Sequence, residues 1–597
     1  MPEGRRGAGA ETRFALWRWG LWFAVLAGLA EALIVAVART ISNRFILISP
    51  AVVWTAPTAN AAVFGTVTVV LWLLMRRAQP SKAANVALPV FLFLFFLGPI
   101  LIVPRLHKYA AILLTAGLAI QGARMLRTRL AFFDRIIRWT LPVLVLLSVG
   151  FGAGFHLSRS AVEKRAQASL PAAAAGAPNV ILIVMDTVRA QSLSLYGYQR
   201  QTSPQLDKFS QGGVVFERAL STAPWTLPSH ASIFTARLPH ELSADWLTPL
   251  NNAHPTLAET LSSRGYVTAG FVANLLYTTA ETGLNRGFQH YADFPLTPGM
   301  LIRESWLTRG LVGPLHSVLG DTDQLVTKSA SDVNGEFLRW LASRPQKPFF
   351  AFLNYFDTHA PYRPPPPFDV KFGPGGPQPD ITVRRTWSQE EIRRSNDAYD
   401  GTIAYLDEQL GKLLAALKTQ GVLENTLVIV TSDHGEQFGE HGLFDHGNGL
   451  YRQVLHVPLI VSFPTRVPAG LRVSRPVSLI NLSATILDLT NATNGGHVLP
   501  GQSLETFWHS PEHYEKPEPL YAEVSKAINM PAWLPATKGD MKSVVVGGMH
   551  FIRNGDGREE LYDFEHDAAE TTDLAGRPES HGALEEARSA LKDALKR

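Results

Sequence analysis

Apolar residues fill the first quarter of the chain in five long runs, which are separated by short segments rich in arginine. The runs cover roughly residues 19–38, 51–75, 86–103, 110–126 and 137–157. A helix needs about 20 apolar residues to cross a bilayer, so each run predicts a membrane-spanning helix. The fourth run is the weakest because two glycines and Gln121 interrupt it. We therefore predict a transmembrane region over residues 1–157, within a lipid bilayer, and a small-residue linker over 158–178.

Positive charges predict the orientation of these helices. Arginine and lysine gather at the N terminus and near residues 76–82 and 124–138, whereas the segments near 39–44 and 105–108 carry only two each. Loops rich in positive charge remain in the cytoplasm. Five crossings then place everything after about residue 158 on the extracytoplasmic or periplasmic side of the cell (inner) membrane. Without the fourth crossing, this orientation would be inverted.

Glu31 lies inside the first apolar run, where an ionisable side chain is costly and often functional. The simpler interpretation is a residue near the outer face that bonds to a neighbouring helix, and we favour it.

After residue 178 the pattern changes to short apolar runs that alternate with amphipathic segments. Buried strands are predicted where aliphatic and aromatic runs end in acids or histidines, at "NVILIVMD", "KPFFAFLNYFDTHAPY" and "NTLVIVTSDHGE". Helical spacing is found in "SNDAYDGTIAYLDEQLGKLLAALKTQG", and "HPTLAETLSSRGYVTAGFVAN" predicts a helix and then a strand. Alternation of this kind predicts an α/β domain, placed at residues 179–505, whose mostly parallel sheet is flanked by helices.

The tail has a different pattern. In "MKSVVVGGMHFIRNGDGREELYDF", glycine-rich turns separate short β runs, as expected for hairpins. We predict a small antiparallel subdomain within residues 506–597.

Composition excludes several classes of protein. The net charge of +4 is small for 597 residues, and the basic residues flank the apolar runs, so we expect no nucleic-acid partner. The chain has no cysteine, which excludes disulfides, thiolate metal sites and a cysteine nucleophile. The oligomeric state stays open.

Three predicted strands end near Asp or His residues: the first at Asp186, the second near Asp357 and His359, and the third at Asp433 and His434. Ligands collect beyond the carboxyl ends of parallel strands, so Asp186, Asp433 and His434 are expected to meet there. Two carboxylates and an imidazole suit one divalent cation, Zn²⁺ or Mn²⁺ rather than Ca²⁺. Asp186 alone has a second interpretation, a cap on the following helix. His441 and His446 follow the pair and strengthen the metal interpretation.

Thr226, in "APWTLPSHASIFTA", also has two interpretations. A threonine two residues before a proline suits a helix N-cap with proline in the first turn. The position equally suits a nucleophile, because backbone N–H groups at a helix start favour negative charge. A threonine hydroxyl needs a base or a metal to activate it.

Several motifs in order resemble the sulfatase family of the alkaline-phosphatase superfamily. They begin with the segment from "NVILIVMD" to "SHASIFTA" and continue through "FFAFLNYFDTHAPYRPP", "VIVTSDHGEQFGEHGLFDHGNG" and "EELYDFEHDAAETTDLA". The resemblance implies that Asp186, Asp433 and His434 bind the metal and that Thr226 is the nucleophile and a fourth ligand. It also implies that His359 contacts the substrate or leaving group and that His446 contacts the substrate anion.

Departures from the family pattern bear on the chemistry. Position 226 is neither Cys nor Ser, so no formylglycine cofactor is expected there. His230 replaces the motif arginine and is counted as catalytic, and Thr187 replaces a second acid. A formylglycine hydrate can expel sulfate by collapsing to an aldehyde, and a plain threonine sulfate ester cannot react in this way. A phosphothreonine can instead be hydrolysed by attack at phosphorus. Membrane-bound relatives that transfer phosphoglycerol or phosphoethanolamine use threonine in this way.

The leading hypothesis is a membrane-anchored, metal-dependent hydrolase or transferase that acts through a covalent Thr226 intermediate, with phosphoester chemistry favoured. A true sulfuric ester hydrolase is the first alternative, and a non-catalytic, membrane-tethered binding module is the second. The membrane region suggests a lipid or another membrane-associated substrate.

Overall fold

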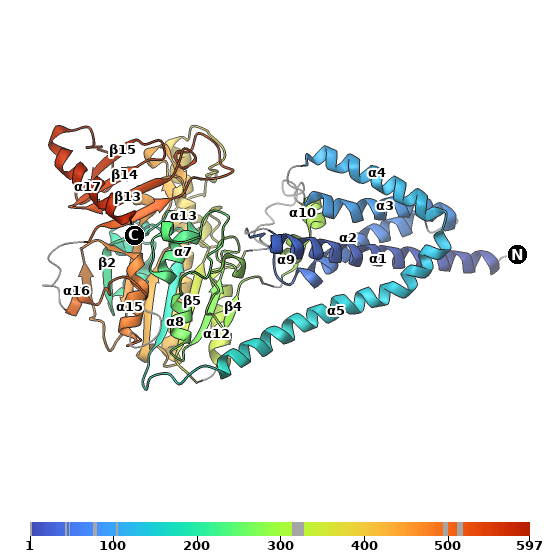
Figure 1. The fold of residues 1–597 in the computed structure, drawn as a ribbon, viewed down its shortest axis with the longest axis horizontal. Helices are drawn as coiled ribbons and strands as arrows, with labels where there is room; N and C mark the ends of the chain where they lie inside the picture. The colour runs from blue at the N-terminus through green and yellow to red at the C-terminus, as the bar shows by residue number, and fades with distance from the viewer. Residues whose placement is uncertain are drawn as a thin grey trace. The chain divides into compact units, whose positions relative to one another are not determined.

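The computed structural model describes residues 3–41, 45–46, 48–75, 80–102, 106–295, 297–312, 327–344, 346–492, 499–509 and 518–596. The chain forms two compact units (Figure 1). The first unit comprises Met1–Arg165 and Phe294–Thr327, and the second comprises Ala166–Asp293 and Lys328–Arg597.

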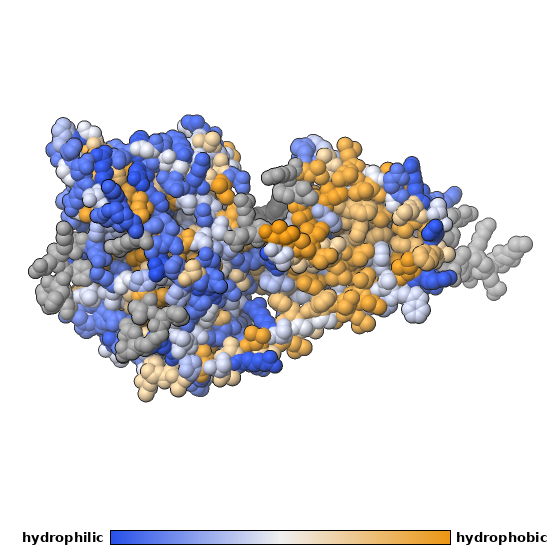
Figure 2. Space-filling model, viewed as in Figure 1, coloured by the Kyte–Doolittle hydropathy of each residue, from blue (hydrophilic) through white to orange (hydrophobic). Residues whose placement is uncertain are grey.

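Five long helices make up most of the first unit. They are α1 (Glu3–Ile41), α2 (Val52–Met75), α3 (Pro80–Leu101), α4 (Lys108–Arg127) and α5 (Leu130–Ala168). Each contains a stretch long and apolar enough to cross a membrane, including the interrupted fourth run. Apolar side chains cover much of the visible face of this unit (Figure 2).

The predicted linker and the predicted orientation in the membrane can be compared with these helices. Residues 158–168, expected to begin the linker, continue α5 as helix, and residues 169–178 have no regular secondary structure. The orientation in the membrane stays a prediction, and residues 42–44, 76–79 and 103–105 of its loops lie outside the described residues.

A segment from the middle of the chain also belongs to the first unit. It contains α9 (Pro298–Arg303) and α10 (Trp306–Val312), although residues 179–505 were expected to form one domain. The Glu31 carboxylate accepts hydrogen bonds from Asn60 of α2 (3.2 Å), the Ser305 hydroxyl (3.2 Å) and the Trp306 backbone N–H (2.9 Å). The predicted bond from Glu31 to a neighbouring helix is thus present, and two residues of the inserted segment bond to the same carboxylate.

A nine-stranded sheet forms the centre of the second unit, with the order β10-β2-β9-β6-β1-β5-β3-β4 and with β11 beside β2. All neighbours are parallel except that β9 is antiparallel to β2 and β6, so the predicted mostly parallel sheet is confirmed. The strands are β1 (Asn179–Met185), β2 (Val214–Leu220), β3 (Val267–Val272), β4 (His290–Ala292), β5 (Phe349–Tyr355), β6 (Thr426–Thr431), β9 (His456–Ser462), β10 (Leu471–Val473) and β11 (Val477–Ser478).

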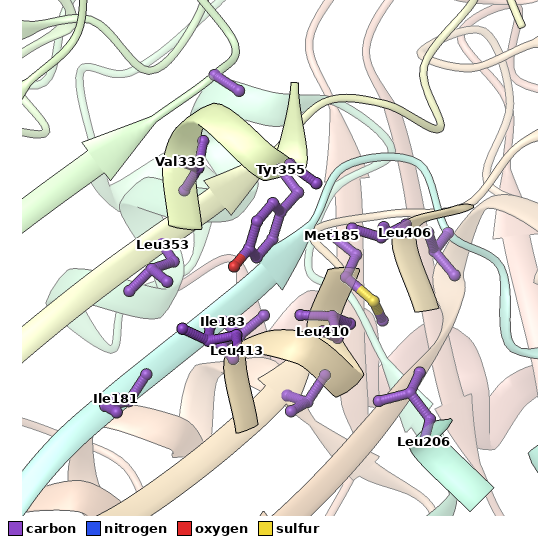
Figure 3. Close-up of a cluster of buried hydrophobic side chains, with 14 of the residues drawn as sticks. Ile181, Ile183, Met185, Leu206, Val333, Leu353, Tyr355, Leu406, Leu410 and Leu413 are labelled. Atoms are coloured by element: carbon purple, nitrogen blue, oxygen red, sulfur yellow. The ribbon is translucent and has the colours of Figure 1, made fainter. Parts of the chain in front are cut away.

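The central strands are buried because helices cover the sheet. Ile183 and Met185 of β1 lie close to Leu406 and Leu410 of α13 (Gln389–Thr419), as Figure 3 shows. The predicted helix of "SNDAYDG…KTQG" is α13, and Gly421 follows it with a left-handed φ of 66°. The other helices of this unit are α6 (Pro204–Ser210), α7 (Thr226–Thr235), α8 (Leu257–Ser262), α12 (Ala330–Ser343), α14 (Arg452–Leu455), α15 (Leu482–Leu489) and α16 (Thr506–His509).

The predicted antiparallel subdomain is present near the C terminus. Its strands are β12 (Leu520–Val524), β13 (Met541–Val546), β14 (Met549–Arg553) and β15 (Glu559–Asp563), and α17 (His581–Ala594) packs on them. Gly547 and Gly548, both with positive φ, make the turn between β13 and β14. A short ribbon of β7 (Gln437–Phe438) and β8 (Phe444–Asp445) lies outside both sheets.

Candidate metal and catalytic centre

Three neighbouring parallel strands bring the predicted site residues to one edge of the sheet. β1 pairs with β5 on one side and with β6 on the other. Asp186 follows β1, His359 follows β5, and Asp433 and His434 follow β6. Parallel register therefore carries side chains from distant parts of the chain to the same place.

The two aspartates each have one carboxylate oxygen held by the protein and one left over. Oδ2 of Asp186 accepts a hydrogen bond from the Asn274 amide (2.7 Å). Oδ1 of Asp433 accepts from the backbone N–H groups of Thr187 (3.2 Å) and His434 (2.9 Å). Oδ1 of Asp186 and Oδ2 of Asp433 are buried and have no hydrogen-bond partner among the described residues. Buried carboxylate oxygens of this kind are suited to bind a cation.

His434 completes the cluster. Its Nδ1–H donates to the Gly435 carbonyl (3.0 Å), which leaves Nε2 as an acceptor or ligand. Ligand atoms of Asp186, Asp433 and His434 all lie within 4.8 Å of one another. Two oxygens and one imidazole nitrogen match the ligands that Zn²⁺ and Mn²⁺ accept, so the residues fit one divalent cation.

Electrostatics support the same conclusion. Burial, and then the nearby Asp433 charge, raise the pKa of Asp186, and burial raises the pKa of Asp433. Burial also lowers the pKa of His434 well below its usual value. The protein alone therefore disfavours two negative charges here, and a cation would offset them.

Thr226 lies at this cluster, but it is not a helix cap. It is the first residue of α7, and Trp225 occupies the N-cap position, so the N-cap prediction was wrong. The Thr226 Oγ1 atom lies 3.3 Å from Nε2 of His434. One turn later, His230 donates from Nδ1 to the Thr226 carbonyl (2.8 Å) and lies 3.6 Å from the Asp433 carboxylate. The helix start therefore turns the hydroxyl toward the cluster instead of toward its own backbone.

Two further histidines lie beside the cluster. The ring of His446 is 4.4 Å from that of His434 and 5.0 Å from that of His359. Nδ1 of His446 lies 2.8 Å from Asp445 and 3.1 Å from Glu436. Burial acts to lower the pKa of His446, but these two carboxylates raise it well above its usual value. The two carboxylates therefore favour the protonated form of the His446 ring and fix its Nδ1 atom.

Some residues of the motifs are used elsewhere. Asp357 accepts the backbone N–H of Ala330 (3.0 Å), and His441 stacks on Tyr451 with ring centres 3.6 Å apart. The described contacts place neither of them in the cluster with Asp186. Sequence reasoning missed Asn274, although it follows β3, the strand next to β5.

Sequence reasoning also missed the two carboxylates around His446. Glu436 comes two residues after His434, and Asp445 comes directly before His446. These positions in the "SDHGE" and "FDHG" segments were the available signal.

The chain matches a known protein family over about half of its length. The family model described as Sulfatase matches residues 178–492. An arylsulfatase of Clostridium perfringens is 26% identical over 377 residues, which cover 53% of this chain and 75% of that protein. Arylsulfatase K of Canis lupus familiaris is 25% identical over 377 residues, covering 56% and 68%. The phosphonate monoester hydrolase of Agrobacterium radiobacter superposes with a TM-score of 0.55 at 21% identity, over 70% of this chain and 96% of that one. The last similarity shows a shared fold.

Proposed function

The chain belongs to the sulfatase family of ester-hydrolysing enzymes, and from this premise we propose that it cleaves phosphate esters through a covalent intermediate on Thr226. The distance of 3.3 Å between Thr226 Oγ1 and His434 Nε2 carries the proposal, because it sets the hydroxyl beside the unsatisfied Asp186 and Asp433 oxygens. A chain without cysteine leaves a hydroxyl as the nucleophile at this position.

Asp186, Asp433 and His434, together with the Thr226 hydroxyl, would hold the divalent cation. When bound, such a cation supplies a Lewis acid that polarises an ester oxygen and stabilises negative charge.

Residues of the chain supply the nucleophile, the proton donor and the contact to the substrate anion. Thr226 supplies the oxygen that attacks phosphorus, and His230 holds the first turn of α7 through the Thr226 carbonyl. The Thr226 hydroxyl gives up its proton to solvent, and the bond from phosphorus to the leaving oxygen breaks as the bond to Thr226 forms. His446, with Nδ1 fixed by Glu436 and Asp445, donates a proton from Nε2 to that oxygen, and His359 steadies the anion. Water or an acceptor hydroxyl then attacks phosphorus and gives its proton to the neutral His446, and the bond from phosphorus to Thr226 breaks as the Thr226 oxygen takes a proton from solvent.

Phosphorus is favoured over sulfur because of the nucleophile. A phosphothreonine intermediate is hydrolysed by in-line attack at phosphorus, so its breakdown does not require the formation of an aldehyde. Sulfate ester hydrolysis is the second candidate, and the names of the relatives, both arylsulfatases, are the observation that favours it.

One experiment separates the candidates. Purified full-length protein is assayed with bis(4-nitrophenyl) phosphate and with 4-nitrophenyl sulfate, and the adduct trapped on Thr226 is weighed at a mass accuracy that resolves phosphate from sulfate. We expect the phosphodiester to be the better substrate, a phosphate adduct, and loss of turnover in Thr226→Ala. Unchanged turnover in Thr226→Ala would end the nucleophile assignment. A purified protein with neither turnover nor stoichiometric Zn²⁺ or Mn²⁺ would instead indicate a binding module.

We further propose that the first unit anchors the enzyme in a membrane, with the site on the extracytoplasmic side. The support is the five apolar helices and the distribution of arginine around them. A C-terminal alkaline phosphatase fusion should be active in a bacterial host, and an inactive fusion together with a fluorescent cytoplasmic reporter fusion would reverse the orientation.

A further inference from the structure

A segment that leaves the second unit and returns to it makes its contacts along the apolar helices of the first unit. The segment contains α9 and α10, which cover residues 298–312. Asp293 before it and Lys328 after it both belong to the second unit. No step of the reaction described above uses the segment, so its place among the apolar helices needs a separate explanation.

The contact with α1 lies well inside the predicted membrane span. The Trp306 backbone N–H donates to Glu31, and Glu31 precedes the end of α1 at Ile41 by about 15 Å along the helix axis. The apolar stretch Ala15–Ile41 has 27 residues. It is about 40 Å long, whereas the hydrocarbon core of a bilayer is about 30 Å thick. A centred α1 would therefore place Glu31 about 10 Å inside the nearer hydrocarbon boundary.

The contact with α2 gives the same depth. The Ser305 hydroxyl lies 2.8 Å from the Asn60 side-chain oxygen, and Asn60 follows the start of α2 at Val52 by about 12 Å. The start of α2 and the end of α1 are close in sequence and lie at the same ends of their helices. Two independent helices thus place Ser305 and Trp306 below the level of the helix ends.

Helix α10 also packs along α3. Leu307 is fully buried in a cluster of apolar side chains that includes Leu97. A Cβ on Gly98 would lie 3.6 Å from Cβ of Leu307, and a Cβ on Gly310 would lie 2.6 Å from Cδ1 of Leu101, the last residue of α3. From Leu307 to Gly310, α10 therefore follows α3 toward the end of that helix.

The break between α9 and α10 is satisfied by the protein. Glu304 and Ser305 are not helical, and their side chains are 1% and 0% exposed. The Glu304 carboxylate accepts the Ser49 backbone N–H (3.2 Å) and the Thr55 hydroxyl (3.3 Å), and the Leu307 N–H donates to Ser305 Oγ (3.2 Å). Irregular backbone at membrane depth is tolerated where protein buries it and supplies its partners.

The outer face of α10 has the residues of a membrane interface. Leu311 is 39% exposed, and the Arg309 guanidinium lies 5.3 Å from the centre of the Trp306 ring. Tryptophan is enriched where a bilayer meets water, and arginine near a helix end extends its charge toward the headgroups. Leu311 directly follows Gly310, which contacts the end of α3, so it continues the apolar surface of a predicted membrane helix.

We propose that residues 298–312 form a re-entrant membrane segment. The segment enters the bilayer from the side of the second unit, reaches the level of Glu31 and leaves by the same side, with lipid covering its exposed face at Leu311. Glu31 is retained in an apolar helix because it accepts the backbone of this segment. The proposal rests on the proposed membrane anchor and not on the proposed chemistry, and it gives the second unit another attachment to the membrane besides α5.

Spin labels test the depth. The chain has no cysteine, so one introduced cysteine of the full-length protein can carry a nitroxide in lipid nanodiscs. Power saturation compares its accessibility to oxygen, which is enriched in lipid, and to nickel-EDDA, which stays in water. Leu33→Cys, at an exposed position one turn or less from Glu31, reports the level of that residue, and Leu311→Cys reports the segment. Leu118→Cys, in the middle of α4, is the lipid control, and Leu595→Cys, on the second unit, is the water control.

We expect the ratio of oxygen to nickel accessibility to be high at Leu33 and Leu118, low at Leu595, and between those of Leu33 and Leu595 at Leu311. A crosslink then tests the contact with α3 in intact membranes. Oxidation of Gly310→Cys with Leu101→Cys should form a disulfide that mass spectrometry finds in the digest. Gly310→Cys with Leu74→Cys, at the opposite end of α2, is the matched control and should form none.

A ratio at Leu311 as low as at Leu595, a low ratio at Leu33, or no disulfide between positions 310 and 101 overturns the proposal. If Leu118 still reports lipid in that case, the membrane anchor stands and the re-entrant segment fails. A low ratio at Leu118 as well would reject the anchor itself. Turnover of bis(4-nitrophenyl) phosphate by the unlabelled protein tests the chemistry separately, because none of these positions lies in the second unit's cluster around Asp186.

Discussion

The amide of Asn274 donates to the Asp186 carboxylate at 2.7 Å, and this bond decides which carboxylate oxygen stays available for a cation. Oδ2 is held by Asn274, and Oδ1 has no hydrogen-bond partner in the described structure. A carboxylate oxygen of Asp186 lies within 4.8 Å of ligand atoms of Asp433 and His434. Asn274 also accepts the backbone N–H groups of Leu276 and Tyr277 (both 3.0 Å), which fix its side chain.

Asn274→Ala should therefore weaken Zn²⁺ or Mn²⁺ binding, because outer groups that orient a ligand typically contribute 10- to 100-fold in affinity. Metal content after dialysis against graded chelator is the measurement, and Asn251→Ala, on an exposed turn, is the control. Wild-type affinity in Asn274→Ala would show that the Asp186 orientation does not depend on this amide.

The pH dependence of turnover should follow His446. Glu436 and Asp445 raise the pKa of His446 despite its burial, so the acid form persists to higher pH. If His446 donates a proton to the leaving oxygen, activity falls as the pH rises through its pKa. Asp445→Asn lowers that pKa and should move the alkaline limb of the kcat profile to lower pH, while Asp369→Asn, at an exposed position, should not. An alkaline limb that stays in place would remove His446 from the acid role.

Stability should depend on pH through His456. Burial, and then the charge of Arg452, lower the pKa of His456 to about 3, while its Nε2–H donates to the Glu217 carbonyl (2.7 Å). The folded-state pKa is below the unfolded value of 6.5. The contribution of His456 to the free energy of unfolding is therefore fully present above pH 6.5 and is lost as the pH falls toward 3. Between pH 7.5 and pH 5 this loss is about 2 kcal/mol.

His456→Gln keeps a donor for the Glu217 carbonyl but does not titrate. Its unfolding free energy should therefore fall by about 2 kcal/mol less than that of the wild type over the same interval. Urea unfolding of the second unit, followed by tryptophan fluorescence at both pH values, measures the difference. Parallel pH dependence in the two proteins would mean that His456 is protonated without cost.

Much of the fold could be predicted because burial on both faces leaves a local signature. The strands before Asp186 and Asp433 are unbroken aliphatic runs, and the helix ending before Gly421 has regular apolar spacing. The meeting of Asp186, Asp433 and His434 at one edge of the sheet could be predicted from the parallel arrangement of the strands alone. Asn274 and Glu436 could not be found in this way. Each acts through a hydrogen bond to the side chain of a site residue, and such a bond leaves no periodic pattern in the sequence.

The Thr226 error has a similar origin. Threonine before a proline satisfies the sequence rule for a cap, but the rule does not see His434, which lies 208 residues away along the chain. The competing tertiary contact shifts the helix start by one residue and makes Trp225 the residue before it. The inserted segment of the first unit was missed for the same reason, since the hydrogen bond from Trp306 to Glu31 of α1 joins residues 275 apart along the chain.

The hydrogen bond between Ser305 and Glu31 should stabilise the first unit. Glu31 is fully buried, and the single proton of the Ser305 hydroxyl is shared between its carboxylate (3.2 Å) and the Asn60 side-chain oxygen (2.8 Å). Gly98 of α3 lies so close that a Cβ there would be 2.5 Å from the Glu31 carboxylate, so the cluster has little room to rearrange. Removing either partner leaves buried polar atoms unsatisfied.

Ser305→Ala and Glu31→Gln should each lower the thermal midpoint of the full-length protein in detergent. In the double variant the losses should be less than additive, with a coupling of about 0.6 kcal/mol, the average found by double-mutant cycles for side-chain hydrogen bonds within a membrane protein. Ser331→Ala, at an exposed position of α12, is the control and should have no effect. Turnover of bis(4-nitrophenyl) phosphate, measured well below the midpoint, should be unchanged, since both residues belong to the first unit and the cluster around Asp186 belongs to the second. Strictly additive losses would mean that Ser305 and Glu31 stabilise the unit independently.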